Sequence, residues 1–212
     1  MAARVITIAQ QKGGAGKTTL AAHLALAWLA QGERVALVDI DPQGSLSQWF
    51  ALRAERLGAG KTGVDLTQLN GWRASAEIDR LKRDHTLVVV DSPPHAQTDA
   101  KIAVRAADLV VIPVQPSPLD VWATRPTIDL AVAEKVPVLL VMNRVPTRRA
   151  MTDDMIAALN GVKAELADAR IGNRSGLAMS MAAGLGIAEH APDTIAAREI
   201  GKAAREILRR IG

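Results

Sequence analysis

The chain has 212 residues, of which 49% are hydrophobic and 23% charged, and this length supports one domain, 1–212, with a sizeable core. It contains no cysteine, which excludes disulfide frameworks, thiolate metal centres and cysteine nucleophiles, and which suits a reducing cytoplasm. The net charge of +4 permits binding to a polyanion, but an aromatic content of 2% disfavours single-strand binding by base stacking. We expect neither a signal peptide nor a membrane-spanning segment.

Short β-branched segments alternate with longer segments of helical periodicity. Strands are predicted at 4–9, 34–39, 86–90, 109–113, 137–142 and 166–171, and helices at 18–30, 45–56, 74–83, 99–106, 120–134 and 152–159. Most of these strands are apolar on both faces, which is typical of parallel strands covered by helices. The alternation predicts an α/β fold with a doubly wound, mostly parallel sheet and helices on both faces. Ligands of such folds lie beyond the carboxyl ends of the strands, so the residues after each strand matter most.

A glycine-rich loop follows the first predicted strand and leads into a helix. It reads Lys12-Gly13-Gly14-Ala15-Gly16-Lys17-Thr18-Thr19. Glycines let backbone N–H groups converge on a phosphate, Lys17 brings a cation to the β- and γ-oxygens, and the Thr18 hydroxyl can bind Mg²⁺. The loop has Gln11 where the general phosphate-loop pattern has its first glycine, and it has an additional lysine, Lys12. A second cation so close to Lys17 is unfavourable without an anion, which we expect to be a phosphate bound by this chain or by a partner chain.

Carboxylates follow two further strands. Asp39 and Asp41 end the second strand, where they can hold Mg²⁺-bound water and orient an attacking one, although Asp41 before Pro42 could instead cap a helix. Asp91 ends the run Leu87-Val88-Val89-Val90, which is typical of a Walker B strand. Asn143 follows a later strand, and its amide can pair with adenine, although a strand-end asparagine is also common.

Together these motifs resemble the deviant Walker A ATPases, which include ParA partition proteins, MinD and the nitrogenase iron protein. The resemblance implies a P-loop fold that binds ATP and Mg²⁺. It implies that Lys12 reaches the partner's phosphates in a nucleotide-sandwich homodimer and that Asp41 lies near the hydrolytic water. It places Asp39 and Asp91 around the magnesium ion with Thr18, and Asn143 at the adenine. Ser117-Pro118-Leu119-Asp120 is similar to small plasmid-type ParA proteins without an N-terminal helix-turn-helix, and the missing cysteines exclude nitrogenase-type reduction.

The C-terminal segment, 193–211, predicts an amphipathic helix. By resemblance to relatives that bind nonspecific double-stranded DNA through C-terminal arginines, we take these basic residues as candidates: Arg170, Arg174, Arg198, Lys202, Arg205 and Arg209. A solvated face with Lys202–Glu206 and Glu206–Arg210 pairs is the alternative. The Met179-Ser180-Met181 stretch is assigned to packing.

The leading hypothesis is a cytoplasmic ParA-like ATPase that associates with the nucleoid when ATP is bound. It would partition DNA or position a cargo, and a ParB-like or other small adaptor would stimulate slow hydrolysis. One alternative is a membrane-surface regulator like MinD, which the tail disfavours because it lacks Phe and Trp. Another is a biosynthetic enzyme on the same scaffold, of the dethiobiotin synthetase or cobyrinate amidase kind.

Overall fold

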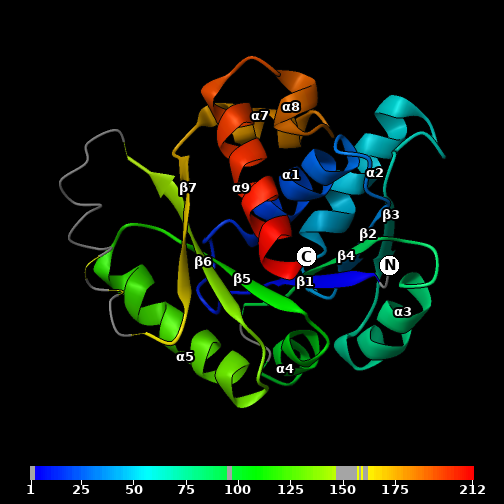
Figure 1. The fold of residues 1–212 in the computed structure, drawn as a ribbon. Coiled ribbons are helices and arrows are strands. Elements are labelled where there is room, and N and C mark those ends of the chain that lie inside the picture. The colour runs from blue at the N-terminus through cyan, green and yellow to red at the C-terminus, as the bar shows by residue number, and fades with distance from the viewer. Residues whose placement is uncertain (1–2, 95–96, 147–156, 158, 160–161) are drawn as a thin grey trace.

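A parallel β-sheet runs through the middle of the protein (Figure 1). In the computed structural model, which describes residues 3–94, 97–146, 157, 159 and 162–212, the sheet has seven strands in the order β3-β2-β4-β1-β5-β6-β7. Every pairing between neighbouring strands is parallel. The strands are β1 (Arg4–Ile8), β2 (Val35–Asp39), β3 (Asp65–Gln68), β4 (Leu87–Asp91), β5 (Leu109–Val114), β6 (Val138–Val145) and β7 (Glu165–Gly172).

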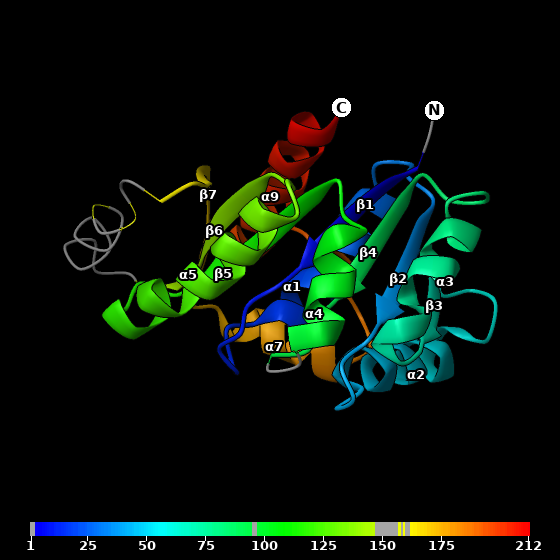
Figure 2. The ribbon, with the colours of Figure 1, turned by 90° about the horizontal axis from the view of Figure 1, so that it is seen from below.

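Helices cover both faces of the sheet, and Figures 1 and 2 show the two layers. One layer holds α1 (Lys17–Leu29), α2 (Ser45–Leu57), α7 (Ser175–Ala182), α8 (Ile187–His190) and α9 (Ile195–Ile211). The other holds α3 (Ala74–Leu81), which follows a short 3₁₀ turn at Gly71–Arg73, together with α4 (Gln97–Arg105) and α5 (Pro118–Ala133). None of the described helices is both long and apolar enough to cross a bilayer.

The apolar character of the strands follows from this double cover. Side chains alternate across a strand, so Ile6 and Ile8 pack under α1 while Val5 packs under α3 and α4. Because both faces are buried, a strand such as β4 needs hydrophobic residues at consecutive positions. The predicted doubly wound fold is confirmed, and so are the six predicted strands, to within two residues at each end apart from the longer carboxyl end of β6.

The structure contains elements that the sequence did not predict. The structure adds β3, whose four residues are exposed or half-buried and therefore lack an apolar run. It also adds α7 and α8, which were not predicted. The predicted helix at 152–159 lies outside the described residues, apart from Ala157 and Leu159.

Helix α9 packs against β7 and bonds to backbone groups of this edge strand. The buried carboxylate of Glu206 accepts hydrogen bonds from the backbone N–H groups of Asp168 and Ala169, both at 2.8 Å. Lys202 donates to the carbonyl of Asp168 at 3.0 Å, so the suggested Lys202–Glu206 pair is wrong, whereas the Glu206–Arg210 pair is present at 3.5 Å. The apolar stripe of α9 is buried against α1 and β7, so it is not available to a membrane surface.

Candidate nucleotide-binding site

The predicted phosphate loop joins β1 to α1 at the carboxyl edge of the sheet. Gly14 and Gly16 have φ angles of +77° and +92°, a left-handed conformation that glycine adopts without steric cost. Gly16 is the N-cap of α1 and no side chain caps that end, so the first amide N–H groups of the helix are available to an anion. Lys17 begins the helix and is 7% exposed. The loop therefore brings the free amide N–H groups of α1 and the Lys17 ammonium group together, where they can bind an anion.

Thr18 and Asp91 meet at the start of α1. The Thr18 hydroxyl donates to Oδ2 of Asp91 at 2.6 Å, while Oδ1 of Asp91 is buried without a hydrogen-bond partner among the described residues. Oxygen atoms of this kind are the ligands that Mg²⁺ prefers, so the pair fits a magnesium site. No group of three or more acidic or histidine side chains in the described part of the chain could hold a metal ion alone. Phosphate oxygens and water would therefore have to complete the coordination.

Burial shapes the charges of this site. Desolvation raises the pKa of Asp91 to about 7, and the neighbouring carboxylates of Asp39 and Asp41 add to that rise. Desolvation also lowers the pKa of Lys17, although Asp91 and Asp41 oppose the shift. The raised pKa means that the ionised form of Asp91 is unfavourable on its own. A cation bound beside it would stabilise that form, so this group of carboxylates favours a positive ion.

The two carboxylates after β2 have different surroundings. Oδ2 of Asp39 accepts from the backbone N–H and the hydroxyl of Ser47, at 2.9 and 2.7 Å, and this bonding secures the start of α2. Asp41 instead accepts from the backbone N–H of Gln43 at 3.0 Å and lines the cavity beside the phosphate loop. The helix-cap interpretation therefore describes Asp39 better than Asp41, because the N-cap of α2 is Gly44.

Two adjoining cavities lie at this edge. The larger, about 690 Å³, is lined by the phosphate loop together with Asp41, Gln43, Arg144 and residues of α7. The smaller, about 170 Å³, is lined by Asn143, Asn173, Arg174 and Ser175 among others. The sequence did not predict that α7 and the 172–175 segment lie beside the phosphate loop, because this proximity arises only from the fold. Met181 packs against the core as expected and also lines the larger cavity, whereas Met179 is 59% exposed.

Asn143 holds the phosphate loop. Its side-chain amide donates to the carbonyl of Ala15 at 2.8 Å, and its side-chain oxygen accepts from the backbone N–H of Arg144 at 3.0 Å. A Cβ atom at Gly16 would lie 2.6 Å from the Asn143 amide nitrogen, so this contact also requires a glycine. Each polar atom of the Asn143 amide thus makes one bond to the protein, and its role in reading adenine stays a prediction.

Lys12 has a partner that the sequence did not reveal. Its ammonium group lies 2.6 Å from Oδ2 of Asp120, which also accepts from the hydroxyl of Ser117, the N-cap of α5. The sequence suggested a phosphate as the anion beside Lys12, and the structure shows a buried carboxylate of the same chain there. The two residues are 108 positions apart, which no local pattern connects.

The candidate DNA-binding residues do not form one group. Arg198, Lys202, Arg205 and Arg209 are all exposed along α9, and Arg198 and Lys202 donate hydrogen bonds to backbone carbonyls. Arg170 is exposed on β7. Arg174 differs, because it forms an ion pair with Glu199 at 2.7 Å and lines the smaller cavity. The structure thus places Arg174 at the smaller cavity, apart from the ridge of exposed cations on α9, which is Arg198, Lys202, Arg205 and Arg209.

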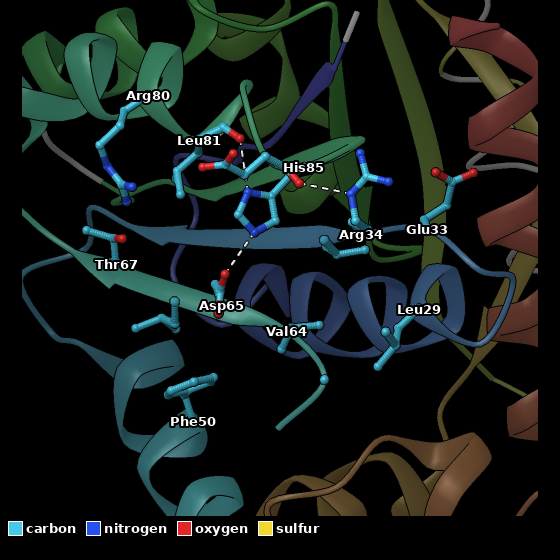
Figure 3. A pocket seen from close by; sticks show the side chains of 14 residues that line it. Leu29, Glu33, Arg34, Phe50, Val64, Asp65, Thr67, Arg80, Leu81 and His85 are labelled. Carbon is cyan, nitrogen blue, oxygen red and sulfur yellow. Dashed lines mark hydrogen bonds and ion pairs between the residues drawn. The ribbon is translucent and has the colours of Figure 1, made fainter. Parts of the chain in front are cut away.

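A further cavity of about 600 Å³ lies at the amino ends of β2 and β3, away from the phosphate loop (Figure 3). Its polar groups already bond to one another. His85 lies 3.0 Å from the Leu81 carbonyl and 2.9 Å from Asp65, and Arg34 donates to the carbonyl of Asp84 at 2.9 Å. These bonds join residues of the cavity wall to one another.

Comparison with known proteins agrees with this geometry. The family model described as "CobQ/CobB/MinD/ParA nucleotide binding domain" matches residues 6–187. The chain is 46% identical over 130 residues to the "Maintenance of carboxysome distribution protein A" of Gloeobacter kilaueensis, a match that covers 61% of this chain and 57% of that protein. It is 35% identical over 158 residues to the protein of the same name from Halothiobacillus neapolitanus, covering 71% and 70%.

Solved structures share the fold. The structure of a Cyanothece McdA variant in complex with ATP superposes with a TM-score of 0.77 over 98% of this chain and 96% of that one, at 18% identity. At this identity the likeness shows the fold alone. The chain spans little more than half the length of the Gloeobacter relative that it matches.

Proposed function

Because this chain belongs to the CobQ/CobB/MinD/ParA nucleotide-binding family, we propose that it is a ParA-type ATPase that positions a cargo through ATP-dependent dimerisation and DNA binding. The observation that carries the proposal is the Thr18–Asp91 contact at 2.6 Å beside an uncapped helix start that holds a buried lysine. This is the arrangement that a triphosphate with a divalent cation requires.

The proposed reaction converts ATP and water to ADP and phosphate. The loop amides and Lys17 bind and orient the phosphates, while Thr18 and Asp91 would hold Mg²⁺. The ion would supply charge neutralisation at the β- and γ-oxygens. Asp41 lines the cavity and orients the attacking water, with no strong base required because positioning carries most of phosphoryl transfer.

Dimerisation would use Lys12. To reach a partner's phosphate, the ammonium group must leave Asp120. Because the Asp120 side chain is 3% exposed, the departure of Lys12 would leave a buried charge without a partner. The γ-phosphate of ATP adds the negative charge that can compete for Lys12, and ADP lacks it. The exchange of Lys12 from Asp120 to the γ-phosphate therefore gives a physical reason why ATP would support dimerisation and ADP would not.

The surface beside Lys12 supports a protein contact. Leu119 and Trp122, on either side of Asp120 along α5, are 64% and 68% exposed. Large apolar side chains exposed next to one another are typical of interaction sites rather than of free surface. A second copy that approaches Lys12 through the nucleotide would cover them.

Cargo positioning rather than metabolism is proposed on two grounds. Two relatives are named for maintenance of carboxysome distribution, so the cargo class we favour is a large protein assembly. The exposed ridge on α9 supplies cations for DNA phosphates without base contacts. A small adaptor protein on the cargo would stimulate hydrolysis, and the protein would lie in the cytoplasm, on the nucleoid when ATP is bound.

The dimer is tested by light scattering of wild type, Lys12→Ala and Lys61→Ala, with Mg-ATP and with Mg-ADP. Lys61 is an exposed lysine in the loop after α2 and serves as the matched control. We expect ATP to double the mass of wild type and of Lys61→Ala, and Lys12→Ala to remain monomeric while it still binds ATP. If Lys12→Ala still formed an ATP-dependent dimer, the proposal that Lys12 contacts the partner's phosphates would be refuted.

DNA binding is tested with a fluorescent duplex at about 50 and about 200 mM salt, in ATP and in ADP. We expect binding only with ATP and a steep salt dependence. Replacing Arg205 and Arg209 with Gln should flatten that dependence, each lost phosphate contact reducing the log–log slope by about 0.9. Arg83→Gln, an exposed arginine after α3, is the control and should behave as wild type. Equal binding in both nucleotides would refute the switch.

A further inference from the structure

Two cationic residues have left-handed backbones. Among the described residues, the non-glycine residues with positive φ are Lys135 at +59° and Arg144 at +52°. Such a conformation crowds Cβ against the following carbonyl oxygen, so it persists only where the surroundings enforce it.

Lys135 has an ordinary structural explanation. It follows the C-terminus of α5, where Val136 N–H donates to the carbonyl of Ala131 at 2.9 Å and Lys135 N–H donates to that of Val132 at 3.1 Å. This pattern ends many helices, and it places the residue after the helix in the left-handed region. The Lys135 backbone therefore reflects the helix end.

Arg144 lies in a strand, where no helix end explains its conformation. It sits in β6 between Met142 and Val145, where the register against β7 shifts as at a β-bulge. Its backbone N–H is held by the Asn143 side chain at 3.0 Å. Bulges beside functional sites re-aim side chains, and this one acts on Arg144.

The re-aimed residue faces the nucleotide-binding site. Arg144 lines both the cavity beside the phosphate loop and the smaller cavity next to it. Its side chain is exposed, and its guanidinium group has no hydrogen bond or ion pair with any residue in the described part of the chain. The strained backbone of Arg144 thus places a guanidinium group with free hydrogen-bond donors where the two cavities meet.

We propose that Arg144 binds the nucleotide directly, through its α-phosphate and ribose. This inference rests on the proposed ATP binding. In this proposal the β- and γ-phosphates lie on the loop and the base lies in the smaller cavity, so the segment between them passes the junction that Arg144 lines. A guanidinium group matches phosphate and hydroxyl oxygens because it donates several hydrogen bonds in one plane. Lys17 serves the outer phosphates, so Arg144 has a separate partner.

The test compares Arg144→Asn with Lys135→Asn by calorimetry with Mg-ATP and Mg-ADP, alongside thermal unfolding of the free proteins. Asparagine tolerates the left-handed backbone, so neither variant should lower Tm. We expect Arg144→Asn to bind ATP and ADP at least about tenfold more weakly, the effect of losing a hydrogen bond to a charged group. Lys135→Asn should bind both as wild type does.

Three results would overturn the inference. Arg144→Asn could bind both nucleotides within twofold of wild type, or it could lose affinity for ATP alone, which would place the contact at the γ-phosphate. A fall in Tm that Lys135→Asn does not share would assign Arg144 a structural role. Wild type that binds neither nucleotide would instead refute the proposed function, so the two failures are distinguishable.

Discussion

Protonation of His23 should weaken the fold. His23 is on α1, directly behind the phosphate loop, and it is 2% exposed. Its Nδ1 accepts from the backbone N–H of Ile187 at 3.1 Å, and its Nε2 lies 3.2 Å from the carbonyl of Leu177, to which it donates in this tautomer. The imidazole thus ties α1 to the α7–α8 region in its neutral form, and acid should break that tie.

The size of the effect follows from the pKa. Burial lowers the pKa of His23 from 6.5 to about 4, against smaller opposing effects of the Leu177 carbonyl and Glu189. Between these values the unfolded chain binds a proton that the folded chain does not, so stability is complete above pH 6.5 and falls as the pH drops towards 4. Lowering the pH from about 7.5 to about 5 should reduce the contribution of His23 to the unfolding free energy by about 2 kcal/mol, with a limiting loss of about 3 kcal/mol. The raised pKa of Asp91 acts in the opposite direction in wild type and variant alike, so the effect of His23 is read from the difference between the two proteins.

Urea unfolding at these two pH values, followed by tryptophan fluorescence, measures this loss. Trp28 is fully buried and its indole N–H donates to the carbonyl of Ala204 at 2.9 Å, so its emission reports on the core. His23→Gln should be less stable at the higher pH but should lose about 2 kcal/mol less than wild type between the two pH values. His190→Gln, at an exposed histidine, should keep the wild-type difference. Equal pH dependence in wild type and His23→Gln would refute the reasoning.

Two further predictions concern the nucleotide-binding site. Asp41→Asn should slow ATP hydrolysis at least about tenfold while ATP affinity stays within a few-fold, since the residue orients water rather than phosphate; unchanged turnover in a phosphate-release assay would contradict this. Asn143→Ala should weaken ATP and GTP by similar factors if Asn143 acts by holding the phosphate loop, which both nucleotides would use. A much larger loss for ATP than for GTP, measured by competition, would support the predicted role of Asn143 in reading adenine.

Local sequence patterns predict those elements whose residues are all buried to a similar degree. The strand Leu87–Asp91 is buried at every position, so its apolar run predicted both its conformation and the Asp91 that ends it. The strand Asp65–Gln68 is at the sheet edge and half-exposed, so its polar residues gave no such signal. The resemblance to ParA-type proteins is confirmed at the level of the family, because its motifs are local.

Contacts between distant segments explain what the sequence could not predict. Asp120 neutralises Lys12 across 108 residues, and Glu206 of α9 caps the N–H groups of β7 rather than pairing with Lys202. Arg174 follows a strand in the sequence, but its ion pair with Glu199 and its place in the smaller cavity depend on how α9 packs. Each is a charged group whose partner is set by the packing of elements.

The phosphate loop and the end of β6 act as one unit. Gly16 is close enough to Asn143 that a Cβ atom would lie 2.6 Å from its amide nitrogen, and Asn143 in turn holds the Ala15 carbonyl and the Arg144 N–H. Moving Asn143 would therefore shift the loop that binds phosphate and the bulge that aims Arg144 at the same time. Because one asparagine supports both, a ligand that orders one of them should order the other, and nucleotide affinity should depend on Asn143 through geometry rather than through direct contact.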